Sequence, residues 1–405
     1  MISEKTVRTG PPRAFWQMCF WGWAALGSFE FLLPLFGQAL RADATTIGLL
    51  FSVFSISALG LRAGLGPLLD RVARRPILIG GLVMYVAALT TFALARTVEL
   101  VVVARLLQGV GSTAVWLTAA VLLAEWNEGG QATGFGRYQM ISVWGAGLAT
   151  AWTGLATALF DAATRAEITR YIRLPSWYPA PWSQLALLHL IFAGNALCAL
   201  VALLMAMRVH ELPRRAPTQR LRLHVPAVLV PLIAVAAISG IADGLLAPVQ
   251  IILLDARFGK GLLGIGVVYA VPGIIYACVP GAAGRWADRH GYRRAAAMGL
   301  LLPVICYLWL PWTSSIVGWA ALLCVEALGL SLATPALFAL VAQAAPVERG
   351  NGYGLFTFAG GIGAALAQGA GGWLYDHAGR PVPFLIAGGC MALGALACRY
   401  VRSTK

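Results

Sequence analysis

Twelve apolar stretches, each about long enough to cross a membrane as a helix, are the feature that most constrains how this chain can fold. They lie at residues 15–36, 47–66, 77–95, 100–123, 133–159, 183–207, 225–246, 262–283, 295–310, 317–341, 353–373 and 383–401. A spanning helix needs about 20 predominantly apolar residues, and only helices and closed barrels satisfy their backbone groups inside a bilayer. Apolar runs of this length predict an all-α integral membrane protein with twelve transmembrane helices.

Composition supports this fold class and excludes a soluble domain. The chain is 59% hydrophobic and 11% charged, with a mean hydropathy of +0.77, whereas a soluble domain is about 25% charged. If the N-terminus is cytoplasmic, twenty lysines and arginines fall in cytoplasmic segments and eight in outer ones. This bias predicts a multi-pass protein of the inner (cytoplasmic) membrane with both termini cytoplasmic. It also explains much of the net charge of +14 without a nucleic-acid partner.

A short charged motif occurs twice, each time between two apolar stretches. It reads G-P-L-L-D-R-V-A-R-R-P from Gly66 and G-R-W-A-D-R-H-G-Y-R-R from Gly284, so the second copy begins 218 residues after the first. A repeat of that period predicts two similar halves. The positions that carry the motif are Gly66, Asp70, Arg71, Arg74, Arg75, Gly284, Asp288, Arg289, Arg293 and Arg294.

The repeat divides the chain into two pseudo-symmetric six-helix bundles. We expect an N-terminal bundle at residues 1–207, a cytoplasmic linker at 208–224 with five arginines and two prolines, and a C-terminal bundle at 225–405. The N-terminal apolar run is expected to be a retained first span rather than a signal peptide. The outer segment 160–182 is rich in proline and aromatic residues. It is interpreted as an interfacial aromatic belt, with a substrate or partner role as the alternative.

The repeated motif resembles the loop between spans two and three of the major facilitator superfamily, which reads G-x-L-x-D-R-x-G-R-R. The first copy departs at Ala73, where the family prefers glycine, whereas the second keeps Gly291. The resemblance implies a monomeric secondary transporter, with the lipid bilayer and a small molecule as its partners. It also implies that Asp70, with the arginines after it, latches the two halves at the cytoplasmic start of span eleven, near residues 348–352, because a helix N-terminus favours an anion.

Span four carries a second resemblance, to an R-x-x-Q-G motif that is linked to proton coupling in the drug and metabolite antiporter branch of that family. The matching residues here are Arg105, Gln108 and Gly109. Arg105 is interpreted either as a cation that tunes a nearby carboxylate or as a structural arginine bonded to backbone carbonyls. Span five lacks the proline of the G-P-x-x-G-G element of these antiporters, which weakens the antiporter assignment.

Two carboxylates occupy matching places in spans one and seven. Glu30 lies in G-S-F-E-F-L-L and Asp243 in G-I-A-D-G-L-L, 213 residues apart. Charged groups inside spans cost about 2.5–3.5 kcal/mol on insertion scales, so they usually face a cavity or a partner. The resemblance places the two acids across a central cavity, where they would exchange protons. The alternative is a structural pair satisfied by neighbouring helices.

Three further ionisable residues lie within the spans. Glu326, in span ten, is expected either to line the cavity or to lie in a helix interface. Arg62 is expected to extend to the lipid headgroups from the end of span two. His189 is interpreted as a packed residue.

These observations favour a transporter over two other classes of protein. The leading hypothesis is proton-coupled export of a small amphipathic or cationic molecule, such as a drug, a siderophore or metallophore, or another metabolite; the alternative is proton-coupled uptake of a small organic solute. An intramembrane enzyme would need a nucleophile or metal constellation, and the five histidines are scattered with no H-E-x-x-H, G-x-S-x-G or C-x-x-C. A non-transporting sensor has no soluble domain to support it. No cofactor or metal is expected.

Overall fold

The structure, a computed structural model, describes residues 10–401 apart from 28, 43, 128, 162–168, 170–181, 211–224, 248 and 259–260. Most of the outer segment 160–182 and of the linker 208–224 therefore lies outside the described residues. The part that is described is all-helical, as the apolar stretches predict.

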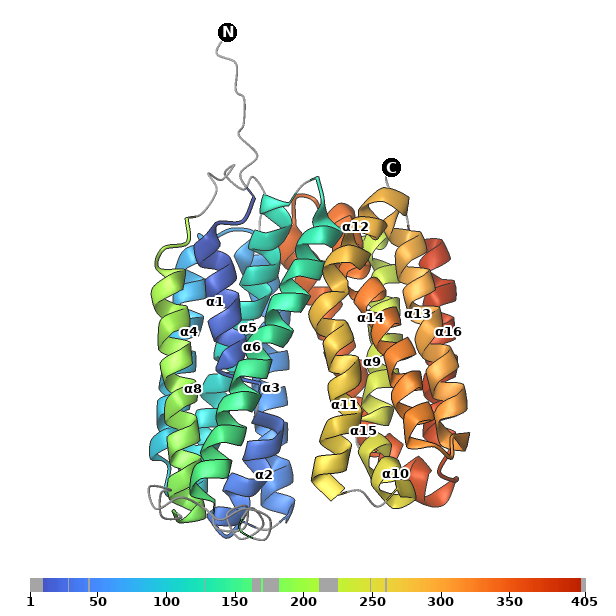
Figure 1. Cartoon of the computed structure of the whole chain (residues 1–405). Helices are drawn as coiled ribbons and strands as arrows, with labels where there is room; N and C mark the ends of the chain where they lie inside the picture. The colour runs from blue at the N-terminus through green and yellow to red at the C-terminus, as the bar shows by residue number, and fades with distance from the viewer. Residues whose placement is uncertain are drawn as a thin grey trace.

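The helices form two bundles, which Figure 1 shows side by side. The first contains α1 (Arg13–Ala24), α2 (Phe29–Ala39), α3 (Ala44–Leu69), α4 (Arg74–Leu94), α5 (Val98–Trp126), α6 (Gln131–Phe160) and α8 (Gln184–Ala206). The second contains α9 (Val230–Leu246), α10 (Val249–Phe258), α11 (Gly261–Cys278), α12 (Pro280–His290), α13 (Tyr292–Trp309), α14 (Ile316–Ala344), α15 (Arg349–His377) and α16 (Val382–Ala397).

The start of α1 and the last described residues after α16 lie at the same end of the molecule, which we call the termini face (Figure 1). The bundles meet near this face and diverge toward the opposite one. The two main contacts between them pair α3 with α15 and α6 with α12. These pairs are equivalent under the sequence repeat, so the two bundles touch through matching helices.

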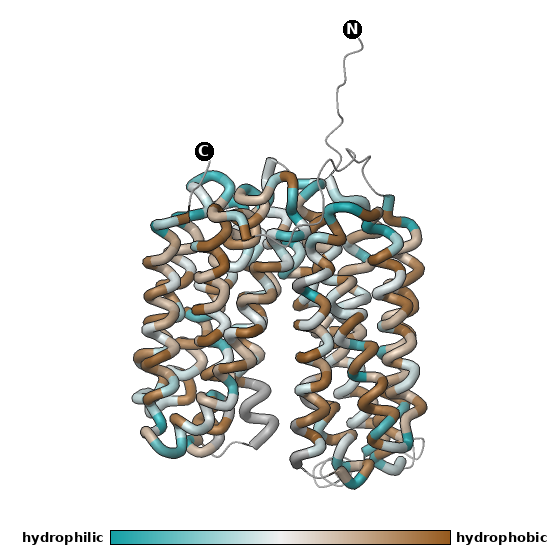
Figure 2. Tube along the Cα trace, turned by 180° about the vertical axis from the view of Figure 1, so that it is seen from behind, coloured by the Kyte–Doolittle hydropathy of each residue, from teal (hydrophilic) through white to brown (hydrophobic). Residues whose placement is uncertain are grey.

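Hydropathy follows the direction of the helices. Figure 2 shows hydrophobic residues along most of their length and hydrophilic ones gathered at the two ends. By length and composition, seven of the described helical segments could each cross a membrane. Two of the longer helices begin with a serine cap: the Ser183 hydroxyl accepts from the Ala186 amide at α8, and Ser315 accepts from Gly318 at α14. Such caps satisfy amide groups that a helix start leaves unpaired.

Two of the expected spans are not continuous helices. The first divides into α1 and α2, and the eighth divides into α11 and α12, whereas the seventh ends with α9 and the separate helix α10 follows beyond the expected stretch. At the first break, a Cβ on Gly27 would lie 2.4 Å from the Cα of Ala146 in α6, so only glycine lets the two backbones approach this closely. The sequence has Pro248 between α9 and α10, and proline lacks the N–H that a continuing helix needs. The apolar pattern predicted unbroken runs because it records burial and not hydrogen bonding.

The two copies of the charged motif turn differently. Gly291 has φ +98°, a conformation that favours glycine. Ala73 has φ −56° and ψ 133°, which any residue adopts. The alanine in the first copy is therefore accommodated by a different turn, and it leaves the motif's other residues in place.

The first glycine of each motif copy lies where helices of opposite bundles approach closely. A Cβ on Gly66 of α3 would lie 2.6 Å from the carbonyl oxygen of Gly350 in α15. A Cβ on Gly284 of α12 would lie 2.2 Å from the carbonyl oxygen of Ala132 in α6. Real Cβ atoms do not come this close to a backbone oxygen, so closure of the termini face depends on glycine at both positions.

Gly66→Ala should therefore open the termini face, because the added methyl group separates α3 from α15. Gly64→Ala on the same helix is the matched control, since a Cβ there would meet nothing within 4 Å. Spin labels at exposed positions Val72 and Val347, in a cysteine-free background, report the distance across this face. We expect longer distances in Gly66→Ala alone; an unchanged distribution in Gly66→Ala would contradict the close-packing argument.

Candidate functional site: the interface between the two halves

A carboxylate from each half binds the start of a helix in the other half. Asp70, which follows α3, accepts hydrogen bonds from the amide groups of Gly350 (2.7 Å) and Asn351 (2.8 Å) in the first turn of α15. This is the contact that the family resemblance implied. The unpaired N–H groups and the dipole of a helix N-terminus both favour an anion. The two halves are thus joined by a pair of charge-assisted hydrogen bonds.

Asp288 makes the equivalent contact from the second half. It accepts from the amide groups of Ala132 (3.1 Å) and Thr133 (3.0 Å), and from the Thr133 hydroxyl, at the start of α6. The sequence analysis named Asp288 but gave it no partner. A signal was present, because subtracting the 218-residue repeat from positions 350 and 351 gives 132 and 133. We call these two contacts the Asp70 latch and the Asp288 latch.

The arginines of the first motif copy bind within their own half. Arg74 forms an ion pair with Glu125 at the end of α5, and its Nε donates to the Leu69 carbonyl at 3.2 Å. Arg75 donates to the Met207 carbonyl at 2.5 Å. The sequence groups these arginines with Asp70 as part of the latch. In the structure they hold the turn before α4 against α5 and α8, and the charge of Arg74 also acts on Asp70.

The remaining motif arginines lie at the surface. Arg71 is half-buried, and the arginines of the second copy are exposed, namely Arg289, Arg293 and Arg294. Their exposure at the termini face fits the charge bias of the loops. Nothing in their described contacts assigns them to the Asp288 latch.

Burial raises the pKa of Asp70 to about 6. The amide groups of Asn351 and Gly350 and the charge of Arg74 act in the opposite direction, and Glu348 adds to the increase. Asp70 follows α3 and lies outside the membrane-spanning segments. Its carboxyl group is therefore mostly ionised at pH 7 and takes up a proton as the pH falls below about 6.

Arg105 lies in a closed environment within the first half. Its side chain is 5% exposed; Nε donates to the Leu50 carbonyl at 2.9 Å and Nη1 to Gln108 Oε1 at 2.7 Å. The guanidinium also lies 4.6 Å from the ring centroid of Phe54. A Cβ on Gly109 would lie 2.7 Å from the Phe54 carbonyl oxygen, so this glycine lets α5 approach α3. These contacts are those of the structural arginine that the sequence left as an alternative.

Two acids of the spans, Asp243 and Glu326, lie in the second half. Glu326 of α14 accepts a hydrogen bond from the Tyr307 hydroxyl at 2.6 Å. The Sγ atom of Cys306 lies 4.0 Å from Oε2 of Glu326. Asp243 of α9 is close enough for its charge to interact with that of Glu326. Glu30 belongs to α2, but its side chain lies outside the described residues. The structure thus brings Asp243 together with Glu326, and the expected pairing of Glu30 with Asp243 stays a prediction.

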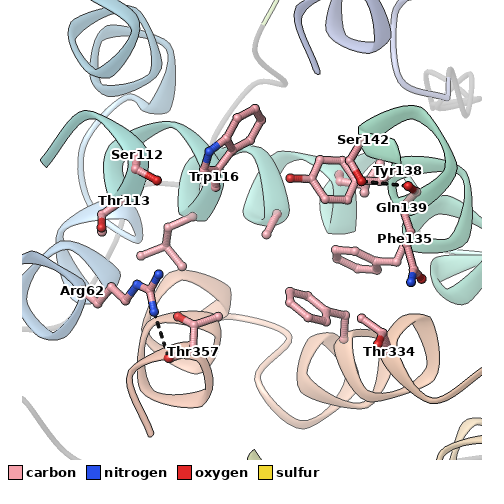
Figure 3. Close-up of a pocket in the computed structure, with 14 residues that line it drawn as sticks. Arg62, Ser112, Thr113, Trp116, Phe135, Tyr138, Gln139, Ser142, Thr334 and Thr357 are labelled. Carbon is pink, nitrogen blue, oxygen red and sulfur yellow. Dashed lines mark hydrogen bonds between the residues drawn. The ribbon is translucent and has the colours of Figure 1, made fainter. Parts of the chain in front are cut away.

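Below the latches, a cavity of about 220 Å³ lies between the halves (Figure 3). Helices α3, α5 and α6 form one side, and α14 and α15 form the other. The lining alternates aromatic and hydroxyl or amide side chains. It consists of Arg62, Ser112, Thr113, Trp116, Leu117, Ala120, Leu123, Phe135, Tyr138, Gln139, Ser142, Thr334, Phe338 and Thr357.

Arg62 is the functional residue that the sequence analysis assigned wrongly. It was expected at the headgroups, but its side chain enters the cavity, and Nη1 donates to the Thr357 carbonyl of the other half at 3.2 Å. Its position eight residues before Asp70 suggested the end of a span. Its direction depends on the contact between α3 and α15, which hydropathy does not reveal. His189 is a packed residue as expected, bonded to the Ala95 carbonyl at 2.8 Å.

The sequence model described as Major Facilitator Superfamily matches the chain twice, over residues 18–235 and 232–405. The chain belongs to the Major Facilitator Superfamily. This family consists of transporters, so the protein is a membrane transporter and not an enzyme.

Two curated members of this family match part of the chain. The inner membrane transport protein YajR of Escherichia coli is 28% identical over 122 residues, 29% of this chain and 27% of that protein. A chloramphenicol resistance protein of Pseudomonas aeruginosa is 36% identical over 93 residues, 22% of each chain. The match spans about a quarter of the length of these curated relatives.

Solved transporters share the fold over nearly the whole chain. FucP in its outward conformation has a TM-score of 0.79 at 16% identity, covering 96% of this chain and 98% of FucP. A bacterial homologue of the iron transporter ferroportin, outward-facing, has a TM-score of 0.72 at 13% identity, covering 96% and 99%. The proton:xylose symporter XylE has a TM-score of 0.70 at 14% identity, covering 95% and 93%.

Replacing either latch carboxylate with alanine should open the termini face. Asp70→Ala and Asp288→Ala each leave two helix amide groups without an acceptor, and hydrogen bonds to charged groups contribute about 1.5–3 kcal/mol. We expect the open population, measured with labels at Val72 and Val347, to rise roughly tenfold or more. Asp70→Asn should impair transport without preventing membrane insertion.

The matched control is Asp376→Asn, which changes a carboxylate near the far end of α15. If Asp70→Asn transports at the wild-type rate, the Asp70 latch is not part of the transport cycle.

Acidification should favour the closed termini face through Asp70. Its pKa is about 6 when the latch is closed, against about 3.9 for an exposed aspartate, so the protonated form favours closure and the effect is lost as the pH rises through about 6. Between pH 7.5 and 5.5 the ratio of closed to open molecules should rise about fourfold from this group. The same spin-label pair measures this ratio. Asp70→Asn cannot titrate, so an identical pH response in that variant would assign the effect to other groups.

Proposed function

We propose that this protein is a proton-coupled exporter of a small amphipathic molecule that works by alternating access. The observation that carries the proposal is the pair of latches, Asp70 on α15 and Asp288 on α6, above a cavity between the two halves. Breaking both latches would let the halves separate at the termini face. With the termini in the cytoplasm, as the arginine bias predicts, the described state is closed to the cytoplasm.

The cavity lining supports an amphipathic cargo. Trp116, Phe135 and Phe338 offer apolar faces, while Thr113 and Gln139 offer hydroxyl and amide groups. Ligand sites commonly combine an apolar lining with a few polar groups that fix orientation. A drug, a siderophore or metallophore, or another metabolite of suitable size would satisfy this chemistry.

Proton coupling is proposed to involve the acids of the second half. Asp243 and Glu326 lie within spans, close enough for their charges to interact, and the Tyr307 hydroxyl orients Glu326. Two neighbouring carboxylates repel each other when both are ionised, so they tend to share a proton. Proton uptake and release at this pair would then accompany the rocking of the halves. Glu30 remains a further candidate.

The direction of transport is tested in membrane vesicles. Everted vesicles energised by respiration carry an acidic interior, so an exporter should accumulate a labelled single-ring amphipathic probe such as para-hydroxybenzoate inside them, and a protonophore should abolish this. Right-side-out vesicles test uptake, which is the alternative function. Accumulation in right-side-out vesicles alone would replace export with uptake.

Asp243→Asn and Glu326→Gln should each abolish accumulation driven by the pH gradient while retaining downhill exchange of the probe. The reason is that neither variant can exchange a proton at the substituted position. Glu99→Gln, which changes an exposed carboxylate at the start of α5, is the control and should behave as wild type. If Asp243→Asn and Glu326→Gln both keep the pH dependence of the wild type, the acid pair is structural.

A further inference from the structure

Arg62 contributes the only charge among the described residues that line the cavity. It is half-buried, and its described hydrogen bond goes to a neutral backbone carbonyl, that of Thr357. The ion pair between Arg74 and Glu125 lies outside the cavity. The guanidinium group has five N–H donors in a planar fork that matches a carboxylate. A cavity with this charge attracts anions and repels cations.

An aromatic wall stands beside Arg62. Trp116 of α5 stacks on Trp23 of α1, with ring centroids 4.9 Å apart, and Trp23 Nε1 donates to the Tyr138 hydroxyl at 3.2 Å. These contacts hold Trp116 and Tyr138 in place from behind, while both line the cavity. The wall is therefore a fixed apolar surface that suits a flat ring.

On the other side of the cavity from Arg62 lies Gln139 (Figure 3). Its Oε1 atom is buried and has no hydrogen-bond partner among the described atoms. A buried acceptor left unpaired costs about 1–3 kcal/mol. A donor on the cargo, such as a hydroxyl or an amine, would satisfy it.

The cavity volume limits the size of the cargo. A cavity of about 150 Å³ is enough to hold benzene, and this one is about 220 Å³. The space therefore fits one ring with one or two polar substituents.

We propose that the cargo is a small organic anion, with a carboxylate or similar group on Arg62, a ring-sized apolar body against Trp116 and Tyr138, and a donor toward Gln139. This inference rests on the proposed transport function and specifies its substrate class. It selects against the cationic cargo that the sequence left open. It also places the cargo and the coupling proton at different positions, because the anion binds to Arg62 of α3 while the acids lie on α9 and α14.

The test is equilibrium binding to the purified full-length protein in detergent, measured by calorimetry, so it does not depend on transport or proton coupling. Three probes share one ring and one hydroxyl: para-hydroxybenzoate, para-hydroxybenzamide and para-hydroxybenzylamine. The benzoate and the benzamide are planar and nearly equal in shape, so they differ mainly in charge, and the benzylamine supplies a cation on a methylene group. We expect the anion to bind at least roughly tenfold more tightly than the neutral amide, and the cation to bind most weakly.

Variants assign the preference to Arg62. Arg62→Gln should remove the tenfold advantage of the anion over the amide, while Arg62→Lys should retain part of it. Arg137→Gln, which changes an exposed arginine of α6, should leave it intact. If Arg62→Gln does not fold, the affinities of the three probes for the wild type and for Arg62→Lys still decide whether the cargo is an anion bound by Arg62.

The proposal is overturned if the amide or the cation binds the wild type as tightly as the anion. It is equally overturned if Arg62→Gln keeps the preference, or if none of the three probes binds saturably. A failure of export with anion binding intact would contradict the proposed direction or coupling and leave the substrate class standing.

Discussion

A carboxylate on the start of a helix from the other half is the interaction on which the described state depends. It occurs twice, at Asp70 with α15 and at Asp288 with α6, and the two sites are related by the sequence repeat. Each site joins an anion to amide groups that a helix start leaves unpaired. Beside each site a glycine, Gly66 or Gly284, lets the backbones meet. Neither feature would hold the halves together alone, because the hydrogen bonds need the close approach and that approach buries the charges.

Much of the fold could be predicted from the sequence. The apolar runs located the helices, and the repeated motif indicated two halves. The breaks within spans could not be predicted in the same way, because hydropathy does not record where a helix stops hydrogen-bonding. Pro248 can be recognised in the sequence as a residue that ends a helix. The need for glycine at position 27 depends on its contact with Ala146, which the sequence does not show.

The site was less predictable because it is built from contacts between halves. The Asp70 partner followed from a family resemblance, and the Asp288 partner could have followed from the repeat. The direction of Arg62 could not, since it depends on how α3 packs against α15. Arg105 resembled a coupling residue by motif, yet its bonds to Leu50 and Gln108 are those of a structural arginine. The motifs therefore located the residues of the site, but they did not predict the partners that each residue contacts.

Among the side chains that the structure describes, Arg62 of the first half lines the cavity, whereas the second half brings the charges of Asp243 and Glu326 into range of each other. Under the proposed function, Arg62 would mark the cargo position and the two acids the proton position. The latches, being symmetric, would serve the motion of both halves equally.

The central claim is that the two latches open together as one unit. Hydrogen exchange measured by mass spectrometry on the wild type and on Asp70→Ala tests it directly, in peptides that cover residues 131–134 and 349–352. We expect loss of the Asp70 carboxylate to accelerate amide exchange at both helix starts, including that of the distant α6. Faster exchange confined to residues 349–352, with 131–134 still protected, would contradict it.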